Sequence, residues 1–203
     1  MNTQLIDNYH VYIPQLISEE EAVSYADEFI KFDEQYHYPT DDKLLHAMNS
    51  MESTAASLYN QIGAVELLCR LTPQISSIVE ETVVPSYSFA RIYRNNDFLP
   101  PHVDRAACEI SLTLHMKGDH SWPFEIEKPD GTIQSFELNR GDAVLYLGPV
   151  AFHSRNTKYQ GTEYVQFFLH YVRSRGIYCN AVFDSMAVMN DHETLLKEYH
   201  ALR

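Results

Sequence analysis

The sequence predicts an α+β fold, a double-stranded β-helix (jelly roll) with N-terminal buttressing helices. Apolar residues recur at helical spacing in the first third of the chain, whereas from Tyr87 onward short segments alternate with a period of two. Helices followed by a run of antiparallel strands are typical of a helix-backed double sheet. No linker or repeat interrupts the 203 residues. We therefore expect a single domain over residues 1–203, mainly helical over 1–84, with a jelly-roll core over 85–180.

Three helices are expected before the strands begin. Ser18 and Glu21 form a possible capping box, and the apolar residues that follow recur at helical spacing as far as residues 36–39. A second helical stretch covers residues 50–71. Thr72-Pro73 then resembles an N-cap followed by proline at the first helical position, which predicts a third helix ending near residues 84–85.

The strand predictions rest on alternation and on turn residues. Residues 110–116 alternate between apolar and polar side chains, and Pro129-Asp130-Gly131 separates two segments in the manner of a hairpin. The expected strands lie at 87–92, 110–116, 124–128, 132–138, 143–147 and 164–172, and the tail over 191–202 has helical character.

Composition narrows the class of protein. The formal charge of −13 and the absence of a Lys/Arg run argue against nucleic acid as a partner. We identify no segment long and apolar enough to span a bilayer, so no membrane partner is expected. The three cysteines are odd in number and form no CxxC pair, which argues against a disulfide framework or a cysteine zinc site. We expect a cytoplasmic location.

His102 and Asp104 are candidate metal ligands. In an extended chain, residues two apart point to the same face, so both side chains can bind one ion. His153 follows 49 residues after Asp104 and is the candidate third ligand. Two imidazoles and one carboxylate leave coordination positions open, as non-haem Fe(II) oxygenases require. An HxD triplet alone is unspecific, because a chain with 10 His and 28 acidic residues can contain one by chance.

The surrounding sequence adds a family resemblance. It is carried by Arg91-Ile92-Tyr93, Pro101-His102-Val103-Asp104-Arg105, residues 108–114, Trp122-Pro123-Phe124, residues 141–146, His153-Ser154-Arg155 and residues 166–172. In this order, residues 87–172 resemble the 2-oxoglutarate/Fe(II)-dependent dioxygenase superfamily and are similar to its small prolyl-hydroxylase-like members. The resemblance implies a hydroxylase with Fe(II) and 2-oxoglutarate as cofactors. Its implied partners are O₂ and a small-molecule or exposed protein side-chain substrate.

The residues that would bind 2-oxoglutarate follow from this resemblance. Such enzymes usually carry an Arg or Lys in the segment after the distal histidine, but residues 161–164 contain no base. Arg155 is our candidate instead, because a planar guanidinium can bind a carboxylate through two hydrogen bonds. The alternative is that Arg155 forms a structural salt bridge. Arg173 and Lys158 are the replacements.

Four further residues each have a functional and a structural explanation. The resemblance implies that the Tyr93 hydroxyl reaches the cosubstrate, although core packing would equally explain a tyrosine there. Gln166 is polar within an apolar strand, so it either contacts the cosubstrate or supports a residue that does. His115 and His170 are the replacements for His153, and sheet histidines with ordinary hydrogen bonds otherwise.

Two other functions remain open at this point. One is a non-haem metal oxygenase or cupin-like enzyme that does not use 2-oxoglutarate, an alternative motivated by the missing base. The other is a non-enzymatic jelly-roll binding protein. The arginines near the expected site (Arg91, Arg94, Arg105) suit a substrate that carries a carboxylate.

Overall fold

The computed structural model describes residues 1–36, 56–184 and 192–202. Within these residues the helices are α1 (Thr3–Asn8), α2 (Glu19–Tyr36), α4 (Ile62–Val79) and α5 (His192–Ala201), with short 3₁₀ helices η1 (Ala106–Cys108) and η2 (Cys179–Ala181). The strands are β1 (His10–Ile13), β2 (Ala56–Tyr59), β3 (Val83–Arg94), β4 (Leu99–His102), β5 (Ile110–Gly118), β6 (Phe124–Glu127), β7 (Ile133–Phe136), β8 (Ala143–Tyr146), β9 (His153–Arg155) and β10 (Glu163–Arg173).

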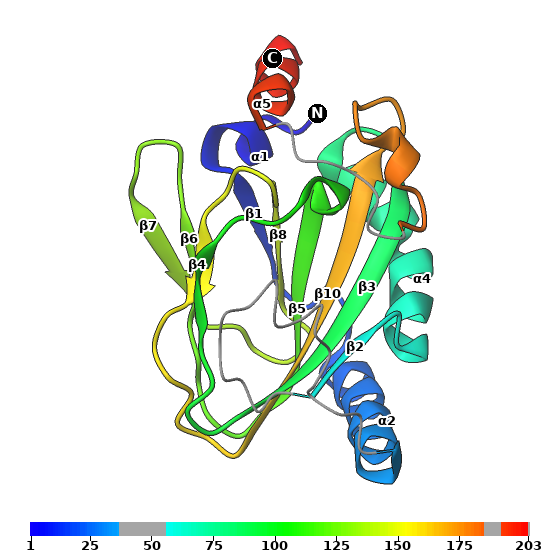
Figure 1. Cartoon of the computed structure of the whole chain (residues 1–203), viewed down its shortest axis with the longest axis vertical. Coiled ribbons are helices and arrows are strands. Elements are labelled where there is room, and N and C mark those ends of the chain that lie inside the picture. Colours follow the sequence, from blue (N-terminus) through cyan, green and yellow to red (C-terminus); the bar gives the residue numbers. More distant parts are fainter. Residues whose placement is uncertain (37–55, 185–191, 203) are drawn as a thin grey trace.

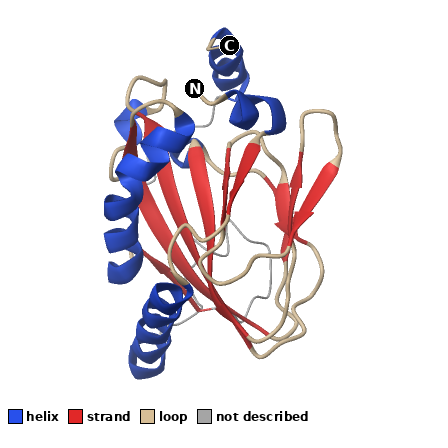
Figure 2. Ribbon diagram, turned by 180° about the vertical axis from the view of Figure 1, so that it is seen from behind, coloured by secondary structure: helices blue, strands red, loops and turns tan. Residues whose placement is uncertain are grey.

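The strands form two antiparallel sheets. The larger sheet has six strands in the order β1-β8-β5-β10-β3-β2, and the smaller has four in the order β4-β9-β6-β7. Figures 1 and 2 show the smaller sheet on one side of the larger sheet and helices α2 and α4 on the other. This arrangement confirms the predicted jelly roll backed by N-terminal helices.

Alternation along the central strands explains the two faces of the large sheet. One face carries the apolar side chains that join those of α4 in the main core: Ile92, Leu112, Leu114, Phe167, Leu169, Leu67, Leu71 and Ile75. Cross-strand neighbours on the opposite face are polar or aromatic, as in the row that joins Tyr87, His170 and Ser111. This second face lines the cavity into which the candidate metal ligands also project.

Two helix predictions are right over residues 62–79, which form α4, but wrong in their boundaries. Residues 56–59 form β2, which pairs with β3, while residues 50–55 lie outside the described part of the chain. Thr72-Pro73 does not open a helix, because α4 runs through Pro73 and the Thr72 hydroxyl donates to the Leu68 carbonyl at 2.8 Å. A proline in a helix interior costs about 3 kcal/mol. Burial of the apolar face of α4 against the sheet offsets that cost.

Strand β1 was not predicted, and β3 begins earlier than predicted. β1 pairs with β8, placing His10 opposite Tyr146. β3 starts at Val83 and includes Pro85, which cannot donate a ladder hydrogen bond. The partner strand β10 is irregular there, with its register shifting between His170 and Tyr171. The irregularity accommodates the proline inside the sheet.

Other predicted elements are confirmed. The Glu21 N–H donates to Ser18 Oγ at 3.1 Å at the start of α2. β6 and β7 form the expected hairpin, and Gly131 in its turn has a φ of 81°, which favours glycine. The tail forms α5, close to the predicted bounds.

Helix α4 departs from the prediction that no segment could span a bilayer. Over its 18 residues the mean hydropathy is 1.2, so by length and composition alone it is long and apolar enough. Its buried residues, among them Leu67, Leu68 and Leu71, belong to the main core. A core helix of this kind passes the same test, so the hydropathy is explained by packing on the sheet.

Candidate metal centre

The three predicted ligands converge on one point. His102 ends β4 and His153 begins β9, and these two residues are direct partners in the antiparallel ladder between the strands. Asp104 lies just beyond β4, where its backbone N–H donates to the Gly148 carbonyl at 2.9 Å. One possible ligand atom from each residue lies within 4.8 Å of the other two. The small sheet therefore holds both histidines, and the backbone after β8 holds the carboxylate.

The Asp104 carboxylate lies close to both imidazoles. Asp104 Oδ1 lies 3.8 Å from His102 Nε2 and 3.6 Å from His153 Nε2. The side chain of His153 is 2% exposed and that of Asp104 15%, whereas that of His102 is 36% exposed. One side of the cluster is thus enclosed and the other is open, which leaves room for further ligands of a bound ion.

Hydrogen bonds to the backbone orient both imidazoles. His102 Nδ1 lies 2.8 Å from the Pro100 carbonyl oxygen, and His153 Nδ1 lies 2.9 Å from that of Ala151. A carbonyl only accepts, so each Nδ1 donates, and in the neutral ring the lone pair then resides on Nε2. Both Nε2 atoms face Asp104, so the donor set fits a metal ion with two imidazole ligands and one carboxylate ligand.

Asp104 is held as an anion. Ser111 Oγ donates to its Oδ2 at 2.8 Å, which leaves Oδ1 facing the histidines. Burial raises the pKa of Asp104, but the neighbouring imidazoles, led by His153, and the Ser111 hydrogen bond outweigh burial and lower it overall. A carboxylate that stays ionised is a ready metal ligand.

His153 is held neutral. Burial lowers its pKa to about 4, although Asp104 acts in the opposite direction. The Tyr146 hydroxyl lies 3.3 Å from its Nε2. An unprotonated imidazole is the form that binds a metal, so at neutral pH this ligand needs no deprotonation.

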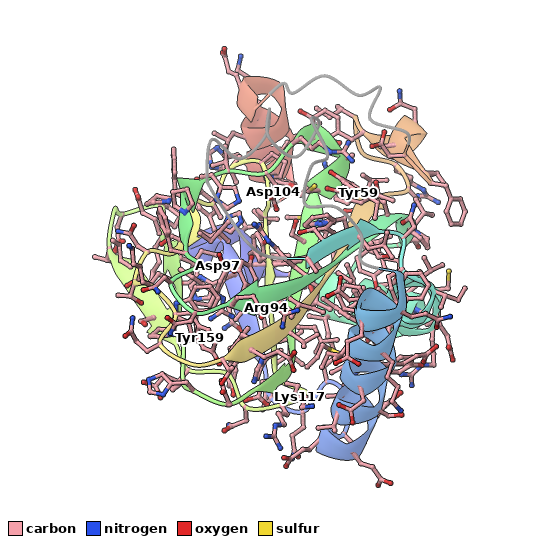
Figure 3. The ribbon with its side chains drawn as sticks, turned by 60° about the horizontal axis from the view of Figure 1, so that its bottom comes forward. Tyr59, Arg94, Asp97, Asp104, Lys117 and Tyr159 are labelled. Atoms are coloured by element: carbon pink, nitrogen blue, oxygen red, sulfur yellow. The ribbon has the colours of Figure 1, made fainter. Side chains whose placement is uncertain are left out.

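The ligands lie in the wall of a cavity of about 250 Å³ between the sheets. Its other walls come mainly from β3 and β10 and include Tyr87, Phe89, Tyr93, Phe168 and His170. Tyr59 of β2 also lines it, and Figure 3 shows Tyr59 and Asp104 toward the same end of the large sheet, with Lys117 toward the other end.

Arg155 is 1% exposed, and it is not among the residues that line this cavity. Its Nη1 donates to the Trp122 carbonyl, and its Nη2 donates to the Tyr164 hydroxyl and to Gln166 Oε1, both at 3.0 Å. Each of these acceptors is neutral. No ion pair joins Arg155 to any carboxylate in the described part of the chain. The structural salt bridge considered from the sequence is therefore absent there, and Arg155 is a buried cation with no counter-ion among the described residues.

Tyr93 and Gln166 flank this cation. Tyr93 lines the cavity, is 0% exposed and packs edge-on against Trp122 at 4.9 Å. Its hydroxyl is buried with no hydrogen-bond partner among residues 1–36, 56–184 and 192–202. Gln166 accepts from Arg155 and donates to Thr113 Oγ1 at 2.5 Å, so it orients the guanidinium. The two residues lie in adjacent strands near Arg155.

The replacement residues have other partners. Arg173 donates from Nε to Glu109 Oε1 at 2.7 Å and so ties β10 to the segment before β5. Lys158 is exposed on a loop. Arg94, one of the arginines expected near the site, pairs with Asp33 and Glu163. None of the three lines the cavity.

The two replacement histidines differ in position. His170 forms a second cluster with Asp104 and Cys108, and its Nδ1 lies 3.0 Å from Ser111 Oγ. Burial lowers its pKa to about 4. His115 stacks on Tyr164 at 4.3 Å and lines a different hollow, away from the ligands. The geometry thus favours His153 as the third candidate ligand, and His170 lies beside the cluster.

Sequence reasoning missed two residues that shape the site. Ser111 bridges Asp104 and His170, and Gly148 leaves no room for a side chain beside Asp104. The sequence does mark Ser111, because it is the first polar residue of the alternating segment 110–116. The sequence marks Gly148 only as part of a Gly-Pro turn, because its neighbours Cys108 and Asp104 lie far from it in the chain.

Fold and site together define a class: a double-stranded β-helix with two histidines and one carboxylate at a cavity between its sheets. Solved structures share this fold. A Pseudomonas putida prolyl-4-hydroxylase aligns with a TM-score of 0.66 at 14% identity, covering 86% of this chain and 97% of that one. HygX from Streptomyces hygroscopicus, solved with nickel and 2-oxoglutarate, aligns with a TM-score of 0.64 at 9% identity, covering 85% of this chain and 86% of that one.

A third solved structure shares the fold. A Trichoplax adhaerens prolyl hydroxylase in complex with a hypoxia-inducible-factor peptide gives a TM-score of 0.67 at 8% identity, covering 85% of this chain and 87% of that one. No protein-family model and no curated protein matches the sequence. At these identities the likeness establishes the fold, which is the one found in 2-oxoglutarate/Fe(II) oxygenases.

Proposed function

We propose that this chain is an Fe(II)- and 2-oxoglutarate-dependent oxygenase that hydroxylates a small molecule or an exposed protein side chain. The observation that carries the proposal is the cluster of His102, Asp104 and His153, whose imidazoles are oriented by backbone carbonyls and whose carboxylate is oriented by Ser111. This donor set suits Fe(II) with positions left open. Structures with the same fold include one with nickel and 2-oxoglutarate bound.

The buried cation supports 2-oxoglutarate as the cosubstrate. A guanidinium remains charged in proteins, and burying a charge without a counter-ion is costly. A carboxylate that reached Arg155 would supply that counter-ion, and the Tyr93 hydroxyl, which lacks a partner among the described residues, could donate to the same group. We assign the distal carboxylate of 2-oxoglutarate to Arg155 and Tyr93, with Gln166 as the residue that positions Arg155.

In this assignment the protein binds and orients the cofactors and the substrate, and it excludes water from the site. His102, Asp104 and His153 would hold the iron. With both cofactors bound, O₂ and 2-oxoglutarate supply the oxidation: 2-oxoglutarate becomes succinate and CO₂, and one oxygen atom enters a substrate C–H bond. The aromatic walls contributed by β3 and β10 restrict the cavity to a substrate that fits against them. The three free cysteines are consistent with a reducing, cytoplasmic setting.

The first experiment is an anaerobic titration of the metal-free protein with Fe(II), with and without 2-oxoglutarate, followed by visible absorption. We expect a charge-transfer band only when both are present, and its loss in Asp104→Ala and His153→Ala. His120→Ala is the matched control, since His120 is exposed and lies outside the cluster. Iron binding without a band would favour a metal enzyme that does not use 2-oxoglutarate, and no iron binding would favour a non-enzymatic binding protein.

A further inference from the structure

Arg105 reaches the same cavity from the other side of Asp104. It lies between Asp104 and the 3₁₀ helix η1, and its side chain lines the cavity. Its guanidinium carbon lies 4.4 Å from the ring centroid of Tyr87, and its Nη1 forms a short ion pair with Asp184. The side chain is therefore fixed at one nitrogen and supported on one face.

The remaining edge of this guanidinium has no partner among the residues that the structure describes. Nε and Nη2 of Arg105 are both buried and make no hydrogen bond there. These two nitrogens form one side of the planar group, and their parallel N–H bonds match the spacing of two carboxylate oxygens. Leaving buried donors unpaired costs about 1–3 kcal/mol each. An edge held in this way is preorganised for an oxyanion.

Aromatic rings line the cavity next to this edge. Tyr87 and Tyr59 stack with centroids 5.4 Å apart, Tyr59 and Phe89 are 4.8 Å apart, and Phe89 and Phe168 are 6.1 Å apart. All four residues line the cavity. A continuous aromatic surface of this kind favours a flat apolar group over a polar chain.

The Arg105 edge is distinct from the place assigned to 2-oxoglutarate. Tyr87, beneath Arg105, and Tyr93, near Arg155, are six residues apart on one strand, which corresponds to roughly 20 Å. Tyr87 is the cross-strand neighbour of His170, which contacts Ser111, the residue that holds Asp104. Arg105 therefore lies close to the candidate metal ligands, whereas Arg155 lies near the other end of this stretch of β3. One carboxylate cannot reach both Arg105 and Arg155.

We propose that the substrate is a small molecule with a carboxylate that binds the Nε/Nη2 edge of Arg105 and with a planar apolar body that packs on Tyr87, Tyr59, Phe89 and Phe168. This substrate assignment rests on the proposed function, whereas the binding site itself does not require it. The anchored acid would lie beside His102, Asp104 and His153, with its body along the aromatic wall.

The test is calorimetric titration of the metal-free protein with phenylacetate and with phenylacetamide, its neutral counterpart. We expect phenylacetate to bind the unmodified protein at least tenfold more tightly than phenylacetamide. Arg105→Gln should abolish that preference, and Arg105→Lys should keep only part of it, because lysine retains the charge but lacks the two-nitrogen edge. Equal binding of acid and amide, or a preference unchanged in Arg105→Gln, would overturn the proposal.

Three controls separate the alternatives. Asp184→Asn removes the ion pair but leaves the Nε/Nη2 edge, so it should keep the acid preference, and loss of the preference there would show that Arg105 acts only through the fold. Tighter binding of phenyl phosphate would overturn the assignment to a carboxylate. Tighter binding of a capped glutamate tripeptide would overturn the small-molecule assignment.

Failure of this proposal can be told apart from failure of the proposed function. The Fe(II)- and 2-oxoglutarate-dependent absorption band should form in Arg105→Gln as in the unmodified protein. Its loss in that variant alone would show that Arg105 binds 2-oxoglutarate instead of substrate. If the unmodified protein forms no band, the proposed function fails, while the phenylacetate titration still reports on the Arg105 edge.

Discussion

His102 and His153 are direct partners in the ladder between β4 and β9, and their ring centroids lie 4.3 Å apart. The pairing places two imidazoles side by side although 50 residues separate them in the chain. Asp104 completes the cluster from the next turn of the backbone, where Gly148 accepts a hydrogen bond from its N–H. Metal affinity should therefore depend on the residues that hold this arrangement as well as on the ligands.

Ser111→Ala should weaken Fe(II) binding about 10- to 100-fold while leaving the fold intact. The substitution removes the hydrogen bond that Ser111 Oγ donates to Asp104 Oδ2, so the carboxylate loses its orientation. Anaerobic Fe(II) titration measures the change. Ser154→Ala is the matched control, because Ser154 is also buried and adjoins His153 but donates to Glu125. Equal weakening in both variants would contradict the assigned role of Ser111.

Gly148→Ala should destabilise the protein by about 1–3 kcal/mol and also weaken Fe(II) binding. A Cβ at this position would lie 2.2 Å from the Cys108 carbonyl oxygen and 2.9 Å from Asp104 Oδ2. Urea unfolding and Fe(II) titration measure the two effects. Gly131→Ala provides the comparison: its φ of 81° strains an alanine, but no atom lies within 4 Å. That variant should lose stability alone, and normal iron affinity in Gly148→Ala would refute the prediction.

Arg155→Gln should raise the Kd for 2-oxoglutarate about 10- to 100-fold, since a hydrogen bond to a charged group contributes about 1.5–3 kcal/mol. Fe(II) affinity should change little, because Arg155 contacts none of the three ligands through a hydrogen bond. Titration of the absorption band with 2-oxoglutarate gives the Kd. Arg140→Gln controls for net charge, as Arg140 pairs with Glu19 at the surface. An unchanged Kd would assign the carboxylate to another residue.

The metal-free protein should lose stability as the pH falls below about 6.5, and His115 should account for part of the loss. Burial and the nearby Arg155 lower the pKa of His115 from 6.5 to about 3. Between these values the unfolded chain binds a proton that the folded protein does not, so unfolding is favoured as the pH falls. Each such histidine contributes a slope of about 1.4 kcal/mol per pH unit.

His115→Gln should reduce this slope by about 1.4 kcal/mol per pH unit, the contribution of one proton. Urea unfolding between pH 5 and 6.5 measures the slope, and we expect the native fold to persist over this range. His120→Gln is the control, because His120 is exposed. The same slope in His115→Gln and in the unmodified protein would show that His115 is protonated in the folded state.

The sequence by itself determined the fold class and predicted the three candidate metal ligands. Period-two alternation over residues 110–116 records which side chains face the helices, and an extended chain places His102 and Asp104 on one face whatever surrounds them. These are local properties, so they survive without knowledge of the neighbours. His153 is the candidate third ligand in the sequence, a choice that the resemblance supports, and the β4–β9 ladder brings it to the other two.

Tertiary packing decided the rest. Pro73 lies within α4 because burial against the sheet outweighs its local cost, and residues 56–59 form a strand because β3 offers a free edge. The surroundings of Arg155 and the unpaired edge of Arg105 depend on residues from distant segments. Burial and hydrogen bonding are set by what the folded chain brings together, and a pattern of neighbouring residues does not contain that information.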